Sequence, residues 1–166
     1  MSVSHSAFEN HFKSSILFKA SVCEHYVESI ISIILSQNSE KMGELKLLLF
    51  DESILTFDYK IRVFEILMKK HYENLLNDEL LKDLRDIRKL RNKVAHFLIA
   101  DEEEANRDEE NKRIRLKDIE GLTTKNIFYT YDECNKFLDR FAQTTDILDE
   151  LLNKISKNEF RQQIKT

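Results

Sequence analysis

The sequence contains no proline and only two glycines among its 166 residues. Proline lacks the amide hydrogen that a helix interior needs, and glycine costs more backbone entropy in a helix than any other residue. Because both helix breakers are nearly absent, most of the chain can stay helical. With 34% charged residues, the composition is typical of a helix-dominated soluble protein.

Cysteine is also scarce, since Cys23 and Cys134 are the only two. They are too few for a disulfide framework and lack the spacing of zinc ligands, so we expect reduced thiols in an intracellular protein. Residues 1–6 carry no basic region followed by an apolar one, so we expect no signal peptide. The apolar stretch from Val22 to Leu35 is interrupted by charged residues and is too short to span a membrane. These features predict a cytoplasmic protein.

The formal charge of −4 and the pI near 5.8 exclude a generally basic nucleic-acid coat. Any contact with RNA must therefore be local. The length fits a single domain over residues 1–166 that is long enough to bury a core, and the sequence shows no internal repeat and no linker.

Apolar residues recur at steps of three and four, which predicts about five helices. We expect them over residues 7–37 (one helix or two joined end to end), 40–50, 56–71, 78–98 and 131–155. The expected core residues are Phe8, Phe12, Ile16, Ala20, Cys23, Val27, Ile30, Ile34, Ile61, Phe64, Leu67, Met68, Leu80, Leu84, Ile87, Leu90, Val94, Phe137, Phe141, Ile147 or Thr144, Leu148, Leu151 and Ile155. The fold class is therefore all-α, a helical bundle.

Turn and cap residues complete this prediction. Asn77 can cap the fourth helix, and Thr130 with Glu133 forms a capping box for the last one. Residues 112–130 alternate or cluster in strand fashion around Gly121, which suggests a small β-hairpin before the last helix. The acidic run at about 101–111 predicts a mobile loop, and we expect residues 157–166 to form a frayed tail.

The segment Arg91-Asn92-Lys93-Val94-Ala95-His96 carries the clearest chemical signal. On a helix, Asn92 and His96 share one face and Arg91 lies on its rim. Arginine can bind a phosphodiester at two points, and histidine can exchange a proton near pH 7. These three are the candidate catalytic residues, although such a set also occurs as a solvated helix edge or a local cap.

The same predicted helix carries the one concentrated basic surface of the chain. Its cations are Lys82, Arg85, Arg88, Lys89, Arg91 and Lys93. We take Arg85, Arg88, Lys89 and Lys93 as candidate RNA-binding residues, against the alternative that the stripe is an ordinary solvated face. Tyr129 and Tyr131 could stack on a base or could simply pack in the hairpin.

Arg91-Asn92-x-x-x-His96, preceded by residues 84–90 (LRDIRKL), resembles the Arg-x-x-x-x-His signature of HEPN domains (higher eukaryote and prokaryote nucleotide-binding). Residues 55–67 (LTFDYKIRVFEIL) resemble the helix that precedes this signature in the mannitol-repressor-like branch. The resemblance implies an all-helical domain that dimerises so that both copies of Arg91 and His96 face one cleft. In many members this cleft is a metal-independent ribonuclease site, and in others it binds nucleotides or proteins.

The resemblance further implies a mechanism in which the RNA 2′-hydroxyl is the nucleophile, with no metal and no cofactor. Glu24 or Glu28 is a supporting acid by the same analogy. The expected partners are a second copy of the chain, an RNA substrate (tRNA or mRNA), and an antitoxin or regulatory protein. The biological role implied is that of a toxin or phage-defence effector.

One departure from the pattern bears on activity. Many active members carry a tyrosine two residues after the histidine, where this chain has Leu98. Either the chain belongs to a branch that does without the phenol, or its catalysis is weak. The alternative function is a non-catalytic regulator that resembles the mannitol repressor and acts by protein or nucleotide binding; an unrelated helical protein is the third reading.

Overall fold

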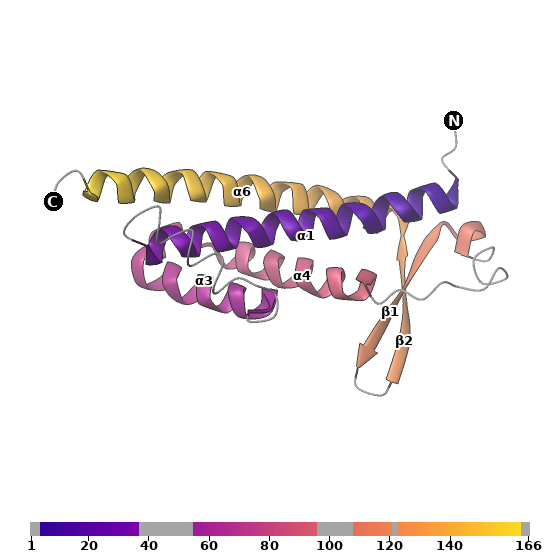
Figure 1. The fold of residues 1–166 in the computed structure, drawn as a ribbon. Coiled ribbons are helices and arrows are strands. Elements are labelled where there is room, and N and C mark those ends of the chain that lie inside the picture. The colour runs from indigo at the N-terminus through magenta and orange to yellow at the C-terminus, as the bar shows by residue number, and fades with distance from the viewer. Residues whose placement is uncertain (1–3, 37–54, 96–107, 121–122, 164–166) are drawn as a thin grey trace.

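The computed structural model describes residues 4–36, 55–95, 108–120 and 123–163 (Figure 1). In these parts the protein is a helical bundle with one two-stranded hairpin, which confirms the predicted fold class. The elements in chain order are α1 (His5–Leu35), α3 (Phe57–His71), the short 3-10 helix η1 (Glu73–Leu75), α4 (Asp78–Ala95), β1 (Arg113–Glu120), β2 (Thr123–Thr130) and α6 (Tyr131–Gln163).

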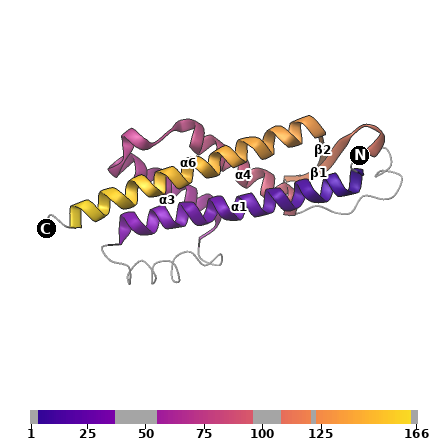
Figure 2. The same cartoon turned by 90° about the horizontal axis from the view of Figure 1, so that it is seen from above.

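The four long helices form two layers, with α1 and α6 side by side over α3 and α4 (Figures 1 and 2). Helices α1 and α6 run in the same direction, because His5 contacts Tyr131 at one end and Tyr26 contacts Asp149 further along. Helix α4 runs the opposite way, and its end lies near the hairpin from which α6 begins. The strands pair antiparallel, with Ile114 opposite Tyr129.

Apolar side chains from all four helices meet in one core. Most expected core positions are buried, including the complete stripe of α4. On α6 the structure decides between the two residues that the spacing allowed, because Thr144 is fully buried and Ile147 is 41% exposed. The hydroxyl of Thr144 donates to the carbonyl oxygen of Arg140 at 2.9 Å, so its burial leaves no unpaired donor.

The predicted boundaries and caps agree closely with the structure. Helix α3 has the expected ends, and the Asn77 side chain accepts the amide of Glu79 at 2.8 Å. Thr130 and Glu133 form the predicted capping box, with the Thr130 amide donating to Glu133 at 2.8 Å. The predicted helix over 40–50 lies outside the described residues.

Two expectations about irregular segments need correction. Helix α6 continues to Gln163, so the described part of the expected frayed tail is helical. Residues 108–110 form a helical turn rather than an open loop, and Asp108 is only 3% exposed. Its carboxylate accepts the Nε atoms of Arg113 and Arg115, each at 2.8 Å, and this pairing fixes the turn to β1.

No helix within the described ranges is both long enough and apolar enough to cross a membrane.

Candidate nucleic-acid interface

The C-terminal half of α4 carries two of the three candidate catalytic residues. Asn92 is exposed and Arg91 is half-buried. His96 lies one residue beyond the last described position of α4, outside the described residues. The structure therefore places Arg91 and Asn92 on the helix, and the geometry of the full set stays a prediction.

Helix geometry separates the charged residues of this segment. Successive residues turn by about 100°, so Arg91 and Lys93 lie on opposite flanks of α4 with Asn92 between them. Asp86, seven residues before Lys93, is on nearly the same flank and binds Arg140 of α6 at 2.6 Å. Lys93 therefore points toward the α6 side of the helix, and Arg91 points away from it.

Two of the four candidate RNA-binding residues are engaged in ion pairs with α3. Arg85 donates to Glu65 at 2.6 Å, and Arg88 contacts Asp58 at 2.9 Å. Of the other two, Lys89 is exposed and Lys93 is half-buried. The basic stripe is thus partly neutralised by carboxylates of the neighbouring helix, which the sequence pattern of α4 alone did not indicate.

The Glu65 carboxylate stays ionised near neutral pH. A hydrogen bond from Lys69, with the charges of Lys69 and Arg85, lowers the pKa of Glu65 below its ordinary value. Asp58 contacts Arg62 as well as Arg88. The surface between α3 and α4 is consequently a band of alternating charge, and its pairs are exposed enough for salt to screen them.

Glu24 and Glu28, the expected supporting acids, are both bonded to one lysine. Nζ of Lys60 lies 2.6 Å from Glu24 and 2.7 Å from Glu28, and the Lys60 side chain is only 1% exposed. Burial alone would lower the pKa of Lys60, but these hydrogen bonds and the two negative charges raise it overall. Both glutamates therefore form ion pairs with Lys60, and a role for them as supporting acids stays a prediction.

A second ion network joins α4 to α6. Arg140 donates to Asp83 and to Asp86, and the hydroxyl oxygen of Thr144 lies 3.3 Å from the Asp83 carboxylate. Burial would lower the pKa of Arg140, but the hydrogen bonds to Asp86 and Asp83 raise it, so the side chain is a permanent cation. No pattern within the sequence indicates this network, because it depends on how two distant helices pack.

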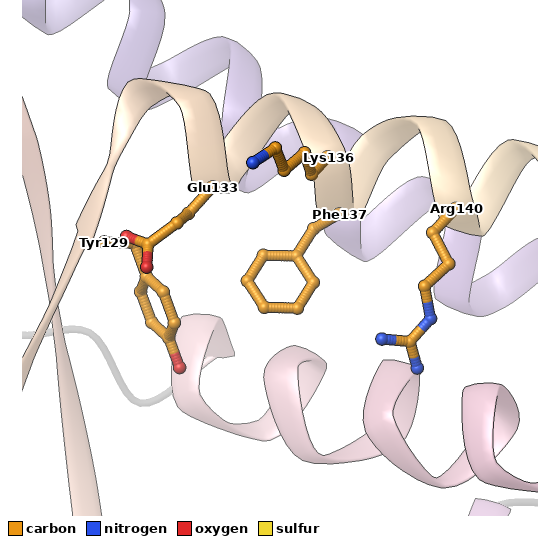
Figure 3. Close-up of a pocket in the computed structure, with 5 residues that line it drawn as sticks. All are labelled: Tyr129, Glu133, Lys136, Phe137 and Arg140. Carbon is orange, nitrogen blue, oxygen red and sulfur yellow. The ribbon is translucent and has the colours of Figure 1, made fainter.

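The same face of α6 lines a pocket of about 190 Å³. Its walls come from the end of β2 and the first three turns of α6: Tyr129, Glu133, Lys136, Phe137 and Arg140 (Figure 3). Of these residues, only Tyr129 was considered as a ligand contact from sequence. The signal that could have found the others is the i, i+3 and i+4 spacing from Glu133 to Arg140.

The two cysteines have no features of a reactive site. Burial raises the pKa of Cys23 to about 11 and that of Cys134 to about 12, so both are protonated thiols near neutral pH. In the part of the chain that the structure describes, no three histidine, cysteine or acidic side chains come together in a way that could hold a metal ion.

Comparisons of this chain with protein-family models, with curated proteins and with solved structures find no match in any of the three.

Proposed function

We propose that the chain is a metal-independent endoribonuclease of the HEPN type that works as a homodimer, in the manner of a toxin or phage-defence effector. The observation that carries the proposal is the Arg91-Asn92-x-x-x-His96 segment at the end of a basic helix. Helix α4 remains regular through Arg91 and Asn92, and Asn92 is exposed, as an interface with RNA requires.

In the proposed reaction, the RNA 2′-hydroxyl attacks the adjacent phosphorus, and the bond from phosphorus to the 5′-oxygen breaks. One His96 takes the proton of the 2′-hydroxyl, and His96 of the second copy gives a proton to the leaving oxygen. Arg91 stabilises the charge that develops on the phosphoryl oxygens, and Asn92 positions the phosphate or orients His96. The products are a 2′,3′-cyclic phosphate and a 5′-hydroxyl.

The dimer is part of the proposal because one copy has a single candidate histidine in this segment. A two-fold axis would place two arginines and two histidines around one cleft and so supply acid, base and cationic clamp. Loss of dimerisation should then abolish cleavage. Cytoplasmic RNA, either tRNA or mRNA, is the proposed substrate.

The test is cleavage of total RNA and of tRNA in EDTA by the purified protein and its His96→Ala and Arg91→Ala variants. Oligomeric state is measured by light scattering on the same samples, and the ends of the products are analysed for cyclic phosphate. Lys154→Ala is the control, because Lys154 is 58% exposed on α6 and lies outside the proposed site. Cleavage that is lost in both folded variants and kept in the control would support the proposal.

One observation favours a second function, a non-catalytic regulator that acts through a protein partner or a nucleotide. Arg85 and Arg88 are already paired with Glu65 and Asp58, which lowers the positive charge that α4 can offer to a phosphate backbone. A regulator of this kind would show no cleavage as a folded dimer. His96→Ala would also leave its partner binding unchanged in a pull-down, whereas a ribonuclease would lose cutting with the same substitution.

A further inference from the structure

The pocket described above lies where strand β2 leads into helix α6. It holds about 190 Å³, and the side chains of Tyr129, Phe137 and Arg140 extend in it from β2 and α6 toward α4 (Figure 3). An apolar cavity of about 150 Å³ is large enough for one benzene ring. The pocket therefore has room for a single planar ring system.

Two aromatic side chains form its inner wall. The rings of Tyr129 and Phe137 meet edge to face, with their centroids 5.5 Å apart and their planes at 85°. Both are half-buried, so part of each ring stays open to a ligand. The capping box of Thr130 and Glu133 lies between them in the chain and fixes the strand to the helix. The aromatic wall is therefore held in place before any ligand arrives.

Arg140 closes the pocket at the end opposite Tyr129, with Phe137 between them (Figure 3). Its Nε and Nη2 atoms donate to Asp83 and Asp86, so its hydrogen-bonding edge is directed at α4. With these atoms held by α4, the flat face of the guanidinium can stack against a ligand. Guanidinium planes and aromatic rings are the two kinds of surface on which unpaired bases stack in RNA-binding proteins.

The position of the pocket along α4 links it to the candidate site. Arg140 lies beside Asp86, and Glu133 is seven residues earlier on α6, which is about 10 Å along the helix axis. Since α4 runs in the opposite direction, the same distance along α4 leads from Asp86 to Lys93. The pocket thus flanks the last turns of α4, the segment that carries the candidate catalytic residues.

Charges around the pocket indicate how a nucleotide would lie in it. Lys136 is exposed on the α6 side, and Lys93 is on the α4 flank that faces α6. The Thr130 amide and hydroxyl hydrogen-bond to Glu133 and lower its pKa, so that the Glu133 wall is negative near neutral pH. A phosphate would avoid Glu133 and lie toward the lysines, which leaves the base for the aromatic wall.

We propose that this pocket binds one unpaired base of a single-stranded RNA, with the adjoining phosphate near Lys136. This inference rests on the proposed function and deepens it, because it assigns the substrate to unpaired RNA and locates the base next to the cleavage site. A duplex would be excluded, since its bases are stacked on one another and cannot enter a pocket.

The test measures binding by fluorescence anisotropy in the His96→Ala background, so that cleavage does not interfere. The probes are a labelled single-stranded RNA and the same strand with abasic residues. Phe137→Leu keeps apolar volume but removes the ring, and Phe18→Leu is the control, because Phe18 is 70% exposed on α1. We expect Phe137→Leu to weaken binding of the intact strand by about tenfold. The abasic strand should bind both proteins equally, and Phe18→Leu should change neither result.

Equal affinity of the parent protein for intact and abasic strands would overturn the proposal, as would unchanged binding by folded Phe137→Leu or no binding of RNA at all. Lys136→Gln, at an exposed position that cannot disturb the core, provides the second variant. This substitution should weaken the binding of the intact and the abasic strand alike. It should also reduce the dependence of affinity on salt by about 0.7 in logarithmic slope. Base-dependent binding without cleavage by the wild-type protein would uphold the pocket and reject the ribonuclease, so the two proposals fail separately.

Discussion

The Nζ atom of Lys60 lies 2.6 Å from Oε1 of Glu24, in the interior between α3 and α1. Glu28 completes the group at 2.7 Å, so two carboxylates share one buried ammonium. Lys60 has the correct partners only when the two helices are in this register. The group therefore specifies how α3 lies on α1, at the cost of removing three charges from water.

Replacing Lys60 by methionine should destabilise the protein by about 3–5 kcal/mol, because two glutamates would stay near the core without a counter-ion. The measurement is the free energy of unfolding in urea. Lys69→Met is the matched control, since the exposed Lys69 pairs with Glu65 on the surface of the same helix. If Lys60→Met were no more destabilising than this control, the buried triad would have no structural role.

The protein should become less stable in alkaline solution, because its two buried thiols stay protonated at a pH where the thiols of the unfolded chain ionise. The pKa of Cys134 is raised from 9.0 to about 12 in the folded protein, so above pH 9 the unfolded chain loses the proton and the folded chain keeps it. The contribution of Cys134 to the free energy of unfolding is complete below pH 9. It is lost as the pH rises toward 12, by about 1.4 kcal/mol per pH unit. Cys134→Ala should show a correspondingly shallower decline in unfolding free energy between pH 9 and 10.5. Parallel curves for the two proteins would contradict the assignment.

The capping box at the start of α6 should contribute measurably to stability. Thr130→Ala removes the hydroxyl that accepts the Glu133 amide at 3.3 Å and donates to its carboxylate at 2.9 Å. We expect a loss of about 1 kcal/mol in unfolding free energy. Ser21→Ala, at an exposed position within α1, should not reproduce this loss, and an equal effect of both substitutions would argue against the cap.

Removing the carboxylates that pair with the arginines of α4 should strengthen RNA binding if this face contacts phosphates. The double variant Asp58→Asn with Glu65→Gln releases Arg88 and Arg85. We expect higher affinity and a salt dependence steeper by about 0.7 in logarithmic slope for each phosphate gained. Asp139→Asn with Asp146→Asn changes the net charge equally at exposed positions of α6. If the two double variants bind RNA alike, only net charge matters and α4 is not the interface.

The sequence predicted the helices well because their apolar spacing and their caps are local properties. The stripe of α4 and the Asn77 cap needed no knowledge of other segments. Thr144 fits the spacing of the buried stripe of α6 but is polar, whereas Ile147 is apolar but lies beside the stripe, so the sequence pattern did not decide between them. The structure separates them because Thr144 faces Asp83 of α4.

The candidate site was less predictable because its contacts join residues far apart in the chain. Arg85 and Arg88 looked like one basic surface as long as α4 was considered alone, and the acids that neutralise them belong to α3. Lys60 falls next to Ile61 in an apolar stripe, and nothing local indicates that Glu24 and Glu28 lie opposite. Such pairs depend on helix register, which spacing within one helix does not determine.

The parallel course of α1 and α6 also determines how the fold would resist mechanical force. Residue 5 lies at one end of the helix pair and residue 163 at the other, so tension between them would pull the two helices past each other along their axes. The contacts between the two helices would then bear the force together, from the His5–Tyr131 pair at one end to the Tyr26–Asp149 pair further along. Force applied to α1 and α6 at the same end would instead separate these contacts one after another, so the bundle should be mechanically stronger along its length than across it.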